Sequence, residues 1–412
     1  MYLAETRGSS PSQTEQTGRL WRRVPANVLA LGVVSLVTDI SSEMVTAILP
    51  LYLVIGLGLN PLQFGLLDGL YAGATAVLRL VGGHVADRWR RLKAVAGIGY
   101  GLSAICKLGL LAAGSSVAAI GGVLAVDRAG KGIRTAPRDA LISLSTEPSK
   151  LGRAFGVHRA LDTLGAFLGP LVAAGVLWAS LGDFNAVFVG SFCIACCGVL
   201  LLVMLVKDHP RLGPATAVPL RGMLGLLSIK AFRRTCGWAA MLGLVTITDS
   251  FVYLALQRRW EVSTALFPLL PIGTAGTFLL LAVPLGRLAD RVGRWKLFLA
   301  GHGALVLALL LLCGPVKSPL LAVVALGLHG AFYAATDGVL PAAAGPLLPE
   351  HLRASGLALL QTGQALARMV SAVLVGLVWT LWDLRPALLA TTAALLLVTI
   401  AAAVVRPWKE AR

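Results

Sequence analysis

Runs of apolar residues recur along the whole chain, separated by short breaks that are rich in charged residues, glycine or proline. A hydrocarbon layer about 30 Å thick needs about 20 apolar residues in each helix that crosses it. The pattern therefore predicts an all-α membrane protein with twelve transmembrane helices. The predicted spans are 28–55, 62–85, 94–113, 118–142, 154–177, 186–206, 235–256, 265–285, 297–313, 320–344, 354–379 and 387–405.

The two groups of six predicted helices carry the same sequence features, which indicates a duplicated unit. A Gly-x-x-x-Asp-Arg motif closes the second span as Gly83, Asp87 and Arg88, and closes the eighth as Gly286, Asp290 and Arg291. A Thr-Asp pair stands in the first span at Asp39 and in the seventh at Asp249. We expect a cytoplasmic tail (1–25), a six-helix half (26–206), a cytoplasmic linker (207–234), a second six-helix half (235–405) and a short cytoplasmic tail (406–412).

Composition and charge narrow the class of protein. With 57% hydrophobic and 13% charged residues, the chain is too apolar for an ordinary soluble enzyme. A net charge of +17 would suggest nucleic acid in a soluble protein, but here the basic residues concentrate in the tail, in loops on one side and in the linker. Basic loops stay in the cytoplasm. We expect a multi-pass protein of the cytoplasmic (inner) membrane with both termini in the cytoplasm, lipid bilayer around it and no nucleic-acid partner.

Three motifs occupy defined loops and spans. The loop motif continues in the second half to Gly293, Arg294 and Lys296, whereas Arg90 replaces the corresponding glycine in the first half. An Arg-x-x-x-Gly motif stands in the fourth span at Arg128 and Gly132. A spaced glycine motif in the fifth span lacks only its final glycine pair, which is replaced by Ala173 and Ala174. Its residues are Gly156, Gly165, Gly169 and Pro170.

Twelve spans in two halves with these motifs resemble the major facilitator superfamily, and the similarity covers essentially the whole chain. The resemblance implies two pseudo-symmetric six-helix bundles around a central cavity. It implies that Arg128 assists proton transfer and that the glycine motif of the fifth span marks an antiporter. It also implies a conformational latch made by the loop motifs. The latch residues are Gly83, Asp87, Arg88, Gly286, Asp290, Arg291 and Gly293.

Placing an ionisable side chain inside a membrane span costs free energy, so each such residue is expected to have a partner or a function. Asp39 and Glu43 lie four residues apart and therefore share one face of the first span. Two neighbouring carboxylates repel each other when both are charged, which suits a group that binds and releases a proton. His158 and Asp162 lie one turn apart in the fifth span and could relay a proton. Fixed ion pairs or structural hydrogen bonds are the alternatives for both pairs.

The fourth span carries an unusual strip of cations at Lys131, Arg134 and Arg138. These side chains could hold a carboxylate or phosphate of the substrate. The alternative is that the lower part of the strip forms salt bridges at the cytoplasmic rim. In the second half the candidates for the cavity wall are polar residues that stand alone in their spans. They are Asp249, Tyr333, Asp337 and Gln361, followed by His329 and Arg368.

Together these features favour a secondary active transporter that moves a small organic solute by alternating access, most simply proton-coupled export (antiport). Proton-coupled or facilitated uptake of an anionic solute is the alternative. A membrane-embedded enzyme is a distant one, because a partial phosphotransferase-like motif at Asp68 lacks the arginine and final aspartate that a metal site would need. We expect a monomer whose partners are the substrate, protons and lipid, without a cofactor, a metal or catalytic residues.

Overall fold

The computed structural model describes residues 24–88, 91–147, 150–208, 224–349 and 352–405, and every regular element in these ranges is a helix. The first half contains α2 (Ala26–Leu51) with η1 (Tyr52–Gly56), α3 (Pro61–Arg88), α4 (Leu92–Ala112), α5 (Val117–Leu144), α6 (Leu151–Ala179) and α7 (Phe184–Leu205). The second half contains η3 (Leu226–Ser228), α9 (Lys230–Val245), α10 (Asp249–Trp260), η4 (Phe267–Leu269), α11 (Leu270–Val292), α12 (Arg294–Cys313), α13 (Pro319–Thr336), α14 (Val339–Ala344), η5 (Gly345–Leu347), α15 (Arg353–Trp382) and α16 (Leu384–Val404).

Within these ranges, 10 helical segments are long and apolar enough to cross a membrane. The predicted class of all-helical membrane protein is confirmed. The number of twelve spans stays a prediction, in which α3 and α5 are the two further spans. Both are 28 residues long, which exceeds the length of a span, and α5 departs from an apolar span by the charges that the sequence placed there.

Two predicted spans are interrupted rather than continuous. The predicted seventh span is divided into α9 and α10, with non-helical backbone at Thr246 and Thr248. The Thr248 hydroxyl donates to the Asp68 carboxylate of α3 at 2.6 Å, and Asp249 occupies the first turn of α10, where a carboxylate complements the positive end of the helix. The predicted tenth span is likewise divided into α13 and α14. An aspartate thus lies at each interruption: Asp249 begins α10, and Asp337 directly follows α13.

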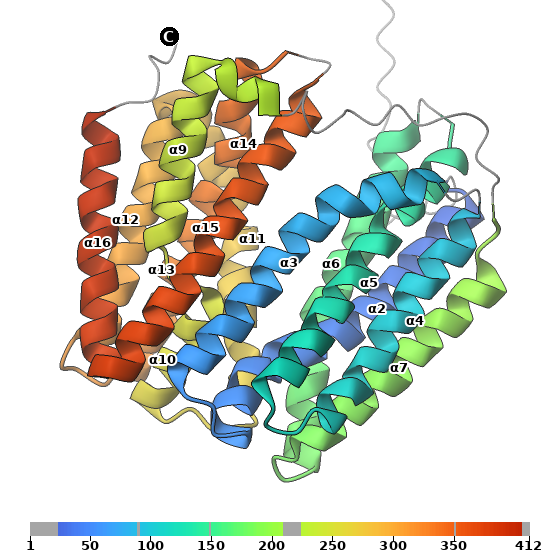
Figure 1. Cartoon of the computed structure of the whole chain (residues 1–412), viewed down its shortest axis with the longest axis horizontal. Coiled ribbons are helices and arrows are strands. Elements are labelled where there is room, and N and C mark those ends of the chain that lie inside the picture. Colours follow the sequence, from blue (N-terminus) through green and yellow to red (C-terminus); the bar gives the residue numbers. More distant parts are fainter. Residues whose placement is uncertain (1–23, 89–90, 148–149, 209–223, 350–351, 406–412) are drawn as a thin grey trace, which may run out of the picture.

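The helices form two bundles, α2–α7 and α9–α16, that lie together at one end and diverge toward the end that carries the C-terminus (Figure 1). The main contact between the bundles joins α3 to α15. Glycine permits this close approach: a Cβ on Gly65 would stand 2.4 Å from the backbone oxygen of Ala372, and one on Gly69 would stand 2.7 Å from that of Met369.

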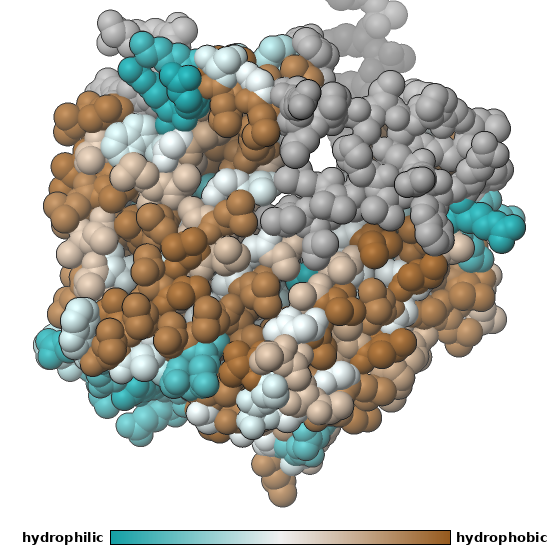
Figure 2. Space-filling view, in the orientation of Figure 1, coloured by the Kyte–Doolittle hydropathy of each residue, from teal (hydrophilic) through white to brown (hydrophobic). Residues whose placement is uncertain are grey.

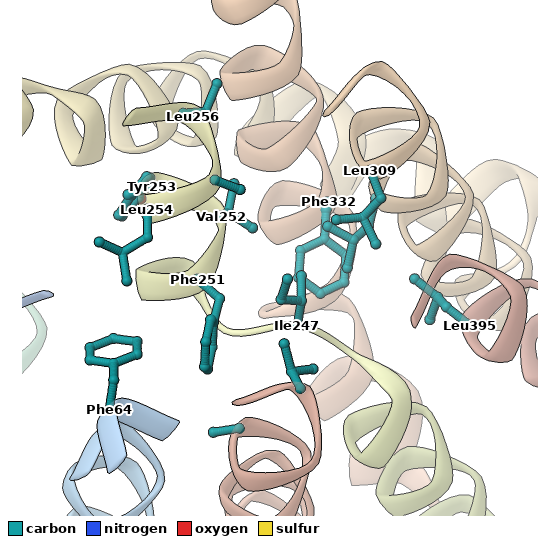
Figure 3. Close-up of a cluster of buried hydrophobic side chains, with 14 of the residues drawn as sticks. Phe64, Ile247, Phe251, Val252, Tyr253, Leu254, Leu256, Leu309, Phe332 and Leu395 are labelled. Atoms are coloured by element: carbon teal, nitrogen blue, oxygen red, sulfur yellow. The ribbon is translucent and has the colours of Figure 1, made fainter. Parts of the chain in front are cut away.

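Aromatic side chains close the end at which the bundles meet. Phe64 of α3 packs edge-on against Phe251 of α10 with ring centroids 4.9 Å apart, and Phe251 packs against Trp379 of α15 at 5.7 Å. Figure 3 shows Phe64 and Phe251 facing each other from their two helices. A backbone-to-hydroxyl bond from Leu62 to Thr380, 2.9 Å long, adds a polar link between the same helices.

The outer faces of the helices expose many large apolar side chains. Trp178, Leu280 and Leu397 are 78%, 77% and 68% exposed, which a protein in water would not tolerate over so wide an area. Figure 2 shows apolar residues over the sides of both bundles and hydrophilic ones mainly toward the two ends. This belt suits contact with lipid chains.

Candidate functional site

A cavity of about 690 Å³ lies between the two bundles and is built from both of them. Six of its lining residues are ionisable acids or bases, three of each sign, among tyrosines and hydroxyl-bearing side chains. They are Glu43, Asp68, Asp249, Arg128, Lys131 and Arg368. A volume of this size accommodates a small organic molecule, and the paired polarity gives it groups that can orient such a molecule.

The second bundle contributes a cluster centred on Asp249. The Tyr333 hydroxyl donates to Asp249 Oδ1 over 2.5 Å, and His329 Nε2 lies 3.2 Å from the same oxygen. The His329 ring is fully buried, whereas the Asp249 side chain is 44% exposed. The guanidinium of Arg368 stands over the Tyr333 ring at 6.0 Å. Asp249 is thus the open end of a polar cluster that extends into the bundle.

The first bundle contributes Glu43, Arg128 and Lys131 to the wall. Arg128 donates from Nε and Nη2 to the same carboxylate oxygen, Oδ2, of its neighbour Asp127 and stacks over the Tyr71 ring at 4.0 Å. Glu43 and Lys131 form no ion pair with any described residue, although both face the same cavity. Two opposite charges without close partners are therefore available to a substrate or to each other.

Asp39 does not line the cavity but faces α5 and α6 inside the first bundle. Its carboxylate lies 3.7 Å from the Arg134 guanidinium, and its side chain is 13% exposed. Arg134 also stacks over the Tyr100 ring at 4.4 Å. The Asp162 carboxylate of α6 lies near that of Asp39. The predicted Asp39–Glu43 face thus divides: Glu43 reaches the cavity and Asp39 joins a buried network.

His158 belongs to the same network. Its Nε2 lies 2.9 Å from the Ser35 hydroxyl, and Arg138 reaches both that hydroxyl at 3.5 Å and the Asp162 carboxylate at 3.7 Å. The predicted partnership of His158 and Asp162 therefore runs through Arg138, with Asp139 as a second partner of that arginine at 3.0 Å.

Of the residues predicted to bind substrate, Lys131, Asp249, Tyr333 and Gln361 line the cavity. Arg134 and Arg138 are held in the ion pairs just described, so of the predicted cationic strip of α5 only Lys131 reaches the cavity. Asp337, at the end of α13, is exposed and is not among the residues that line the cavity. The sequence did not indicate Tyr71 or Thr248. Their small polar groups are unremarkable in a span until neighbouring helices are placed beside them.

The glycine motif of α6 divides into two parts. A Cβ on Gly165 would stand 2.4 Å from the Leu36 carbonyl oxygen, and one on Gly169 would stand 2.6 Å from the Glu43 Cβ, so these glycines allow α6 to lie against α2. Pro170 lines the cavity. Gly156 has nothing within 4 Å of its Cβ position. Packing accounts for the middle of the motif and not for its first glycine.

The predicted latch can be followed in the second half only. Asp290 pairs with Arg294 at 3.0 Å, and Arg294 donates to the Ala342 carbonyl of α14 at 2.7 Å. Gly293 has a φ of 104°, which a residue with a side chain would rarely adopt. In the described residues Gly286 and Arg291 make no comparable contact. Gly83, Asp87 and Arg88 fall at the end of α3, where side chains lie outside the described structure.

Comparison with known proteins identifies this two-bundle arrangement. The model of the Major Facilitator Superfamily matches residues 31–280 and 247–411. The chain belongs to the major facilitator superfamily. An uncharacterized MFS-type transporter of Methanocaldococcus jannaschii is 31% identical over 371 residues, which cover 87% of this chain and 89% of the relative. The puromycin resistance protein of Streptomyces alboniger is 32% identical over 255 residues, which cover 56% of this chain and 46% of that protein.

Solved structures confirm the major facilitator fold. A mutant of the nucleoside transporter NupG superposes with a TM-score of 0.81 at 15% identity, covering 93% of this chain and 100% of that one. A mutant of the peptide transporter POT in complex with sulfate superposes with a TM-score of 0.74 at 16% identity, covering 93% of this chain and 94% of that one. Proteins of this superfamily are transporters and not enzymes, so the predicted class of small-molecule transporter is confirmed, as is its multi-pass membrane character.

Proposed function

We propose that the protein exports a small organic solute across the cytoplasmic membrane in exchange for protons. The observation that carries this proposal is the cavity between the bundles, which both bundles line with charged and hydroxyl groups and which Phe64, Phe251 and Trp379 close at one end. A site lined by two bundles that meet at one end suits alternating access, because tilting one bundle against the other would expose it on the opposite side.

The open end is the one at which α7 ends and α9 begins (Figure 1), and in the sequence the basic linker joins these two helices. We infer that this end faces the cytoplasm, together with both termini. The structure would then be the state that receives a solute from the cell interior. The domain bounds of the two halves and the linker, and a monomeric state, are part of this proposal and rest on the sequence.

Coupling to protons is proposed from the acidic residues of the first bundle. Glu43 faces the cavity beside Arg128, while Asp39, Asp162 and His158 form the buried network behind it. Export is favoured over uptake by the antiporter-like glycine motif of α6. The partial relative named as a puromycin resistance protein supports the same direction, since resistance proteins in this superfamily commonly act by efflux.

The direction of transport can be tested in everted membrane vesicles with an imposed pH gradient. Vesicles containing the protein should accumulate a substrate when their interior is acidic and should lose it when a protonophore is added. Puromycin is the first probe, followed by a panel of anionic, cationic and neutral compounds pre-screened by thermal shift. Accumulation in right-side-out vesicles under an inward proton gradient would instead establish uptake.

Uptake of an anionic solute is the second candidate because one observation favours it. Lys131 of the first bundle and Arg368 of the second both line the cavity, and neither forms an ion pair in the described ranges. A carboxylate or phosphate bound between them would draw the two bundles together. The vesicle assay separates this function from export by the sign of the flux.

A further inference from the structure

Asp249 is a charged group of the second bundle that lies open to the cavity. Its side chain is 44% exposed, and it begins α10 directly after the interruption of the span. A proton arriving through the cavity can reach this carboxylate without crossing packed side chains. Asp39, by comparison, is 13% exposed and lies beside Arg134. Access from the cavity therefore favours Asp249 over Asp39 as a proton-binding carboxylate.

Behind Asp249 lies a proton acceptor that is buried completely. His329 Nε2 stands 3.2 Å from Asp249 Oδ1, but without the alignment of a hydrogen bond, and its Nδ1 lies 3.4 Å from the Thr274 hydroxyl. A neutral imidazole has one N–H for these two neighbours, whereas an imidazolium has two. Protonation would thus give each neighbour a donor, and the Asp249 carboxylate would balance the new charge.

We propose that Asp249 and His329 form a proton-binding pair in the cavity wall, with Tyr333 as a positioning residue that holds the carboxylate toward the imidazole. This proposal rests on the proposed function in that proton binding here serves transport. It adds a proton site in the second bundle to the acids of the first bundle, and it gives His329 a role that the sequence did not indicate.

The surroundings of the pair come from several helices. Tyr253 of α10 stands with its ring 6.0 Å from His329, Arg368 of α15 lies over Tyr333, and Asp68 of α3 is bonded to Thr248 beside Asp249. Asp337 follows at the end of α13. His302 of α12 is separated from His329 by Phe332, whose ring centre is 5.3 Å from His302 and 6.3 Å from His329. Arg368 opposes a positive charge on His329, and the three carboxylates favour one.

Proton binding by the pair would change the charge of the cavity. Its described lining holds three acids, Glu43, Asp68 and Asp249, and three bases, Arg128, Lys131 and Arg368, so the formal sum is zero when all are charged. One proton on the Asp249–His329 pair makes the sum +1. In an antiporter this sequence of charges favours an organic cation as the substrate, because the proton and the cation would then alternate at the same carboxylate.

The test observes proton binding directly and needs no substrate. The full-length protein, with ¹⁵N-labelled histidine, is placed in lipid nanodiscs and followed by NMR between pH 8 and pH 5. The His329 signal, identified by its loss in His329→Gln, should convert to the imidazolium form in the wild type. It should stay neutral over this range in Asp249→Asn, and Tyr333→Phe should move the conversion to lower pH. His302 contacts the Phe298 carbonyl and, among the described residues, no carboxylate, so it is the matched control and should stay neutral throughout.

A His329 signal that is neutral over the whole range, or one that titrates identically in Asp249→Asn, would overturn the proposal. Both results are read from folded protein, because Asp249→Asn keeps the shape of the side chain and each variant is first checked by gel filtration. The outcome is independent of the vesicle assay. If His329 titrates but no proton-driven flux is seen, the proton-binding pair is supported and antiport is rejected. If proton-driven flux is seen but His329 does not titrate, antiport is supported and the pair is rejected.

Discussion

Asp39 and Asp249 derive from the same Thr-Asp pair of the duplicated sequence, and their environments can be compared helix by helix. Each contacts the fourth segment of its own half and stands near the fifth: Asp39 meets Arg134 of α5 and Asp162 of α6, and Asp249 meets His329 and Tyr333 of α13 near Arg368 of α15. The Asp39 carboxylate is 13% exposed, lies within a continuous helix and faces an arginine. The Asp249 carboxylate is 44% exposed and lies in the cavity wall at the start of a helix.

This difference shows how a duplicated fold divides its tasks. The backbone positions are kept, but the partners change from a permanently charged arginine to a histidine, whose protonation can vary near neutral pH, and a neutral tyrosine that donates a hydrogen bond. We infer that the Asp39 network mainly holds the first bundle together, whereas the Asp249 cluster responds to what enters the cavity. The following predictions test this division, starting with the largest expected effect.

Substitution of Asp39 should cost far more stability than substitution of Asp249. Asp39→Asn leaves the Arg134 guanidinium, whose side chain is 4% exposed, without its carboxylate, which should lower the free energy of unfolding by about 3 kcal/mol. Asp249→Asn should change it by less than about 1 kcal/mol. Thermal unfolding in detergent measures both. If Arg134→Leu added to Asp39→Asn does not recover most of the loss, the network is not the cause.

The glycine packing that brings α6 to the Asp39 network should be nearly as sensitive. Gly165→Ala places a methyl group against the Leu36 carbonyl oxygen and should destabilise the protein by about 2 kcal/mol through overpacking. Gly156→Ala, in the same motif but with nothing within 4 Å, is the matched control and should leave the melting temperature unchanged. Equal effects of the two substitutions would mean that the motif acts in some way other than packing.

The link between the Asp249 cluster and the first bundle should have a moderate effect on conformation. Thr248→Val removes the 2.6 Å hydrogen bond to Asp68, and a loss of about 1 kcal/mol would shift the equilibrium between open and closed forms about fivefold. Distances between spin labels on α3 and α15 at the closed end would report the change. Thr362→Val, another hydroxyl of the cavity wall, is the comparison and should leave the distances unaltered.

The smallest effect is expected outside both sites. Asp290 and Arg294 form an ion pair whose side chains are 64% and 38% exposed, so Asp290→Asn should change stability by less than about 0.5 kcal/mol. Its effect should instead appear in the rate of transport if the loop acts as a latch. A large loss of stability with an unchanged rate would show that the motif is structural.

The order and class of the helices could be predicted from hydrophobic runs and motifs because lipid imposes a strong pattern on sequence. The site was predictable only in part. The position of Asp249 in the cavity followed from its isolation in a span, but the burial of Arg134 did not, because Asp39 and Tyr100, which satisfy it, come from helices distant in sequence. The interruption at Thr246 was also missed, and the bond from Thr248 to Asp68 that accompanies it joins two helices distant in the sequence.

The interruption between α9 and α10 also affects how the backbone exchanges with solvent. The first α-helical bond of α10 runs from the Val252 amide to the Thr248 carbonyl, and residues 247–250 line the cavity. Amide hydrogens just before Val252 therefore lack the protection that helical neighbours give. In deuterated water this short stretch should take up label well before the middle of α2, although both lie inside predicted spans.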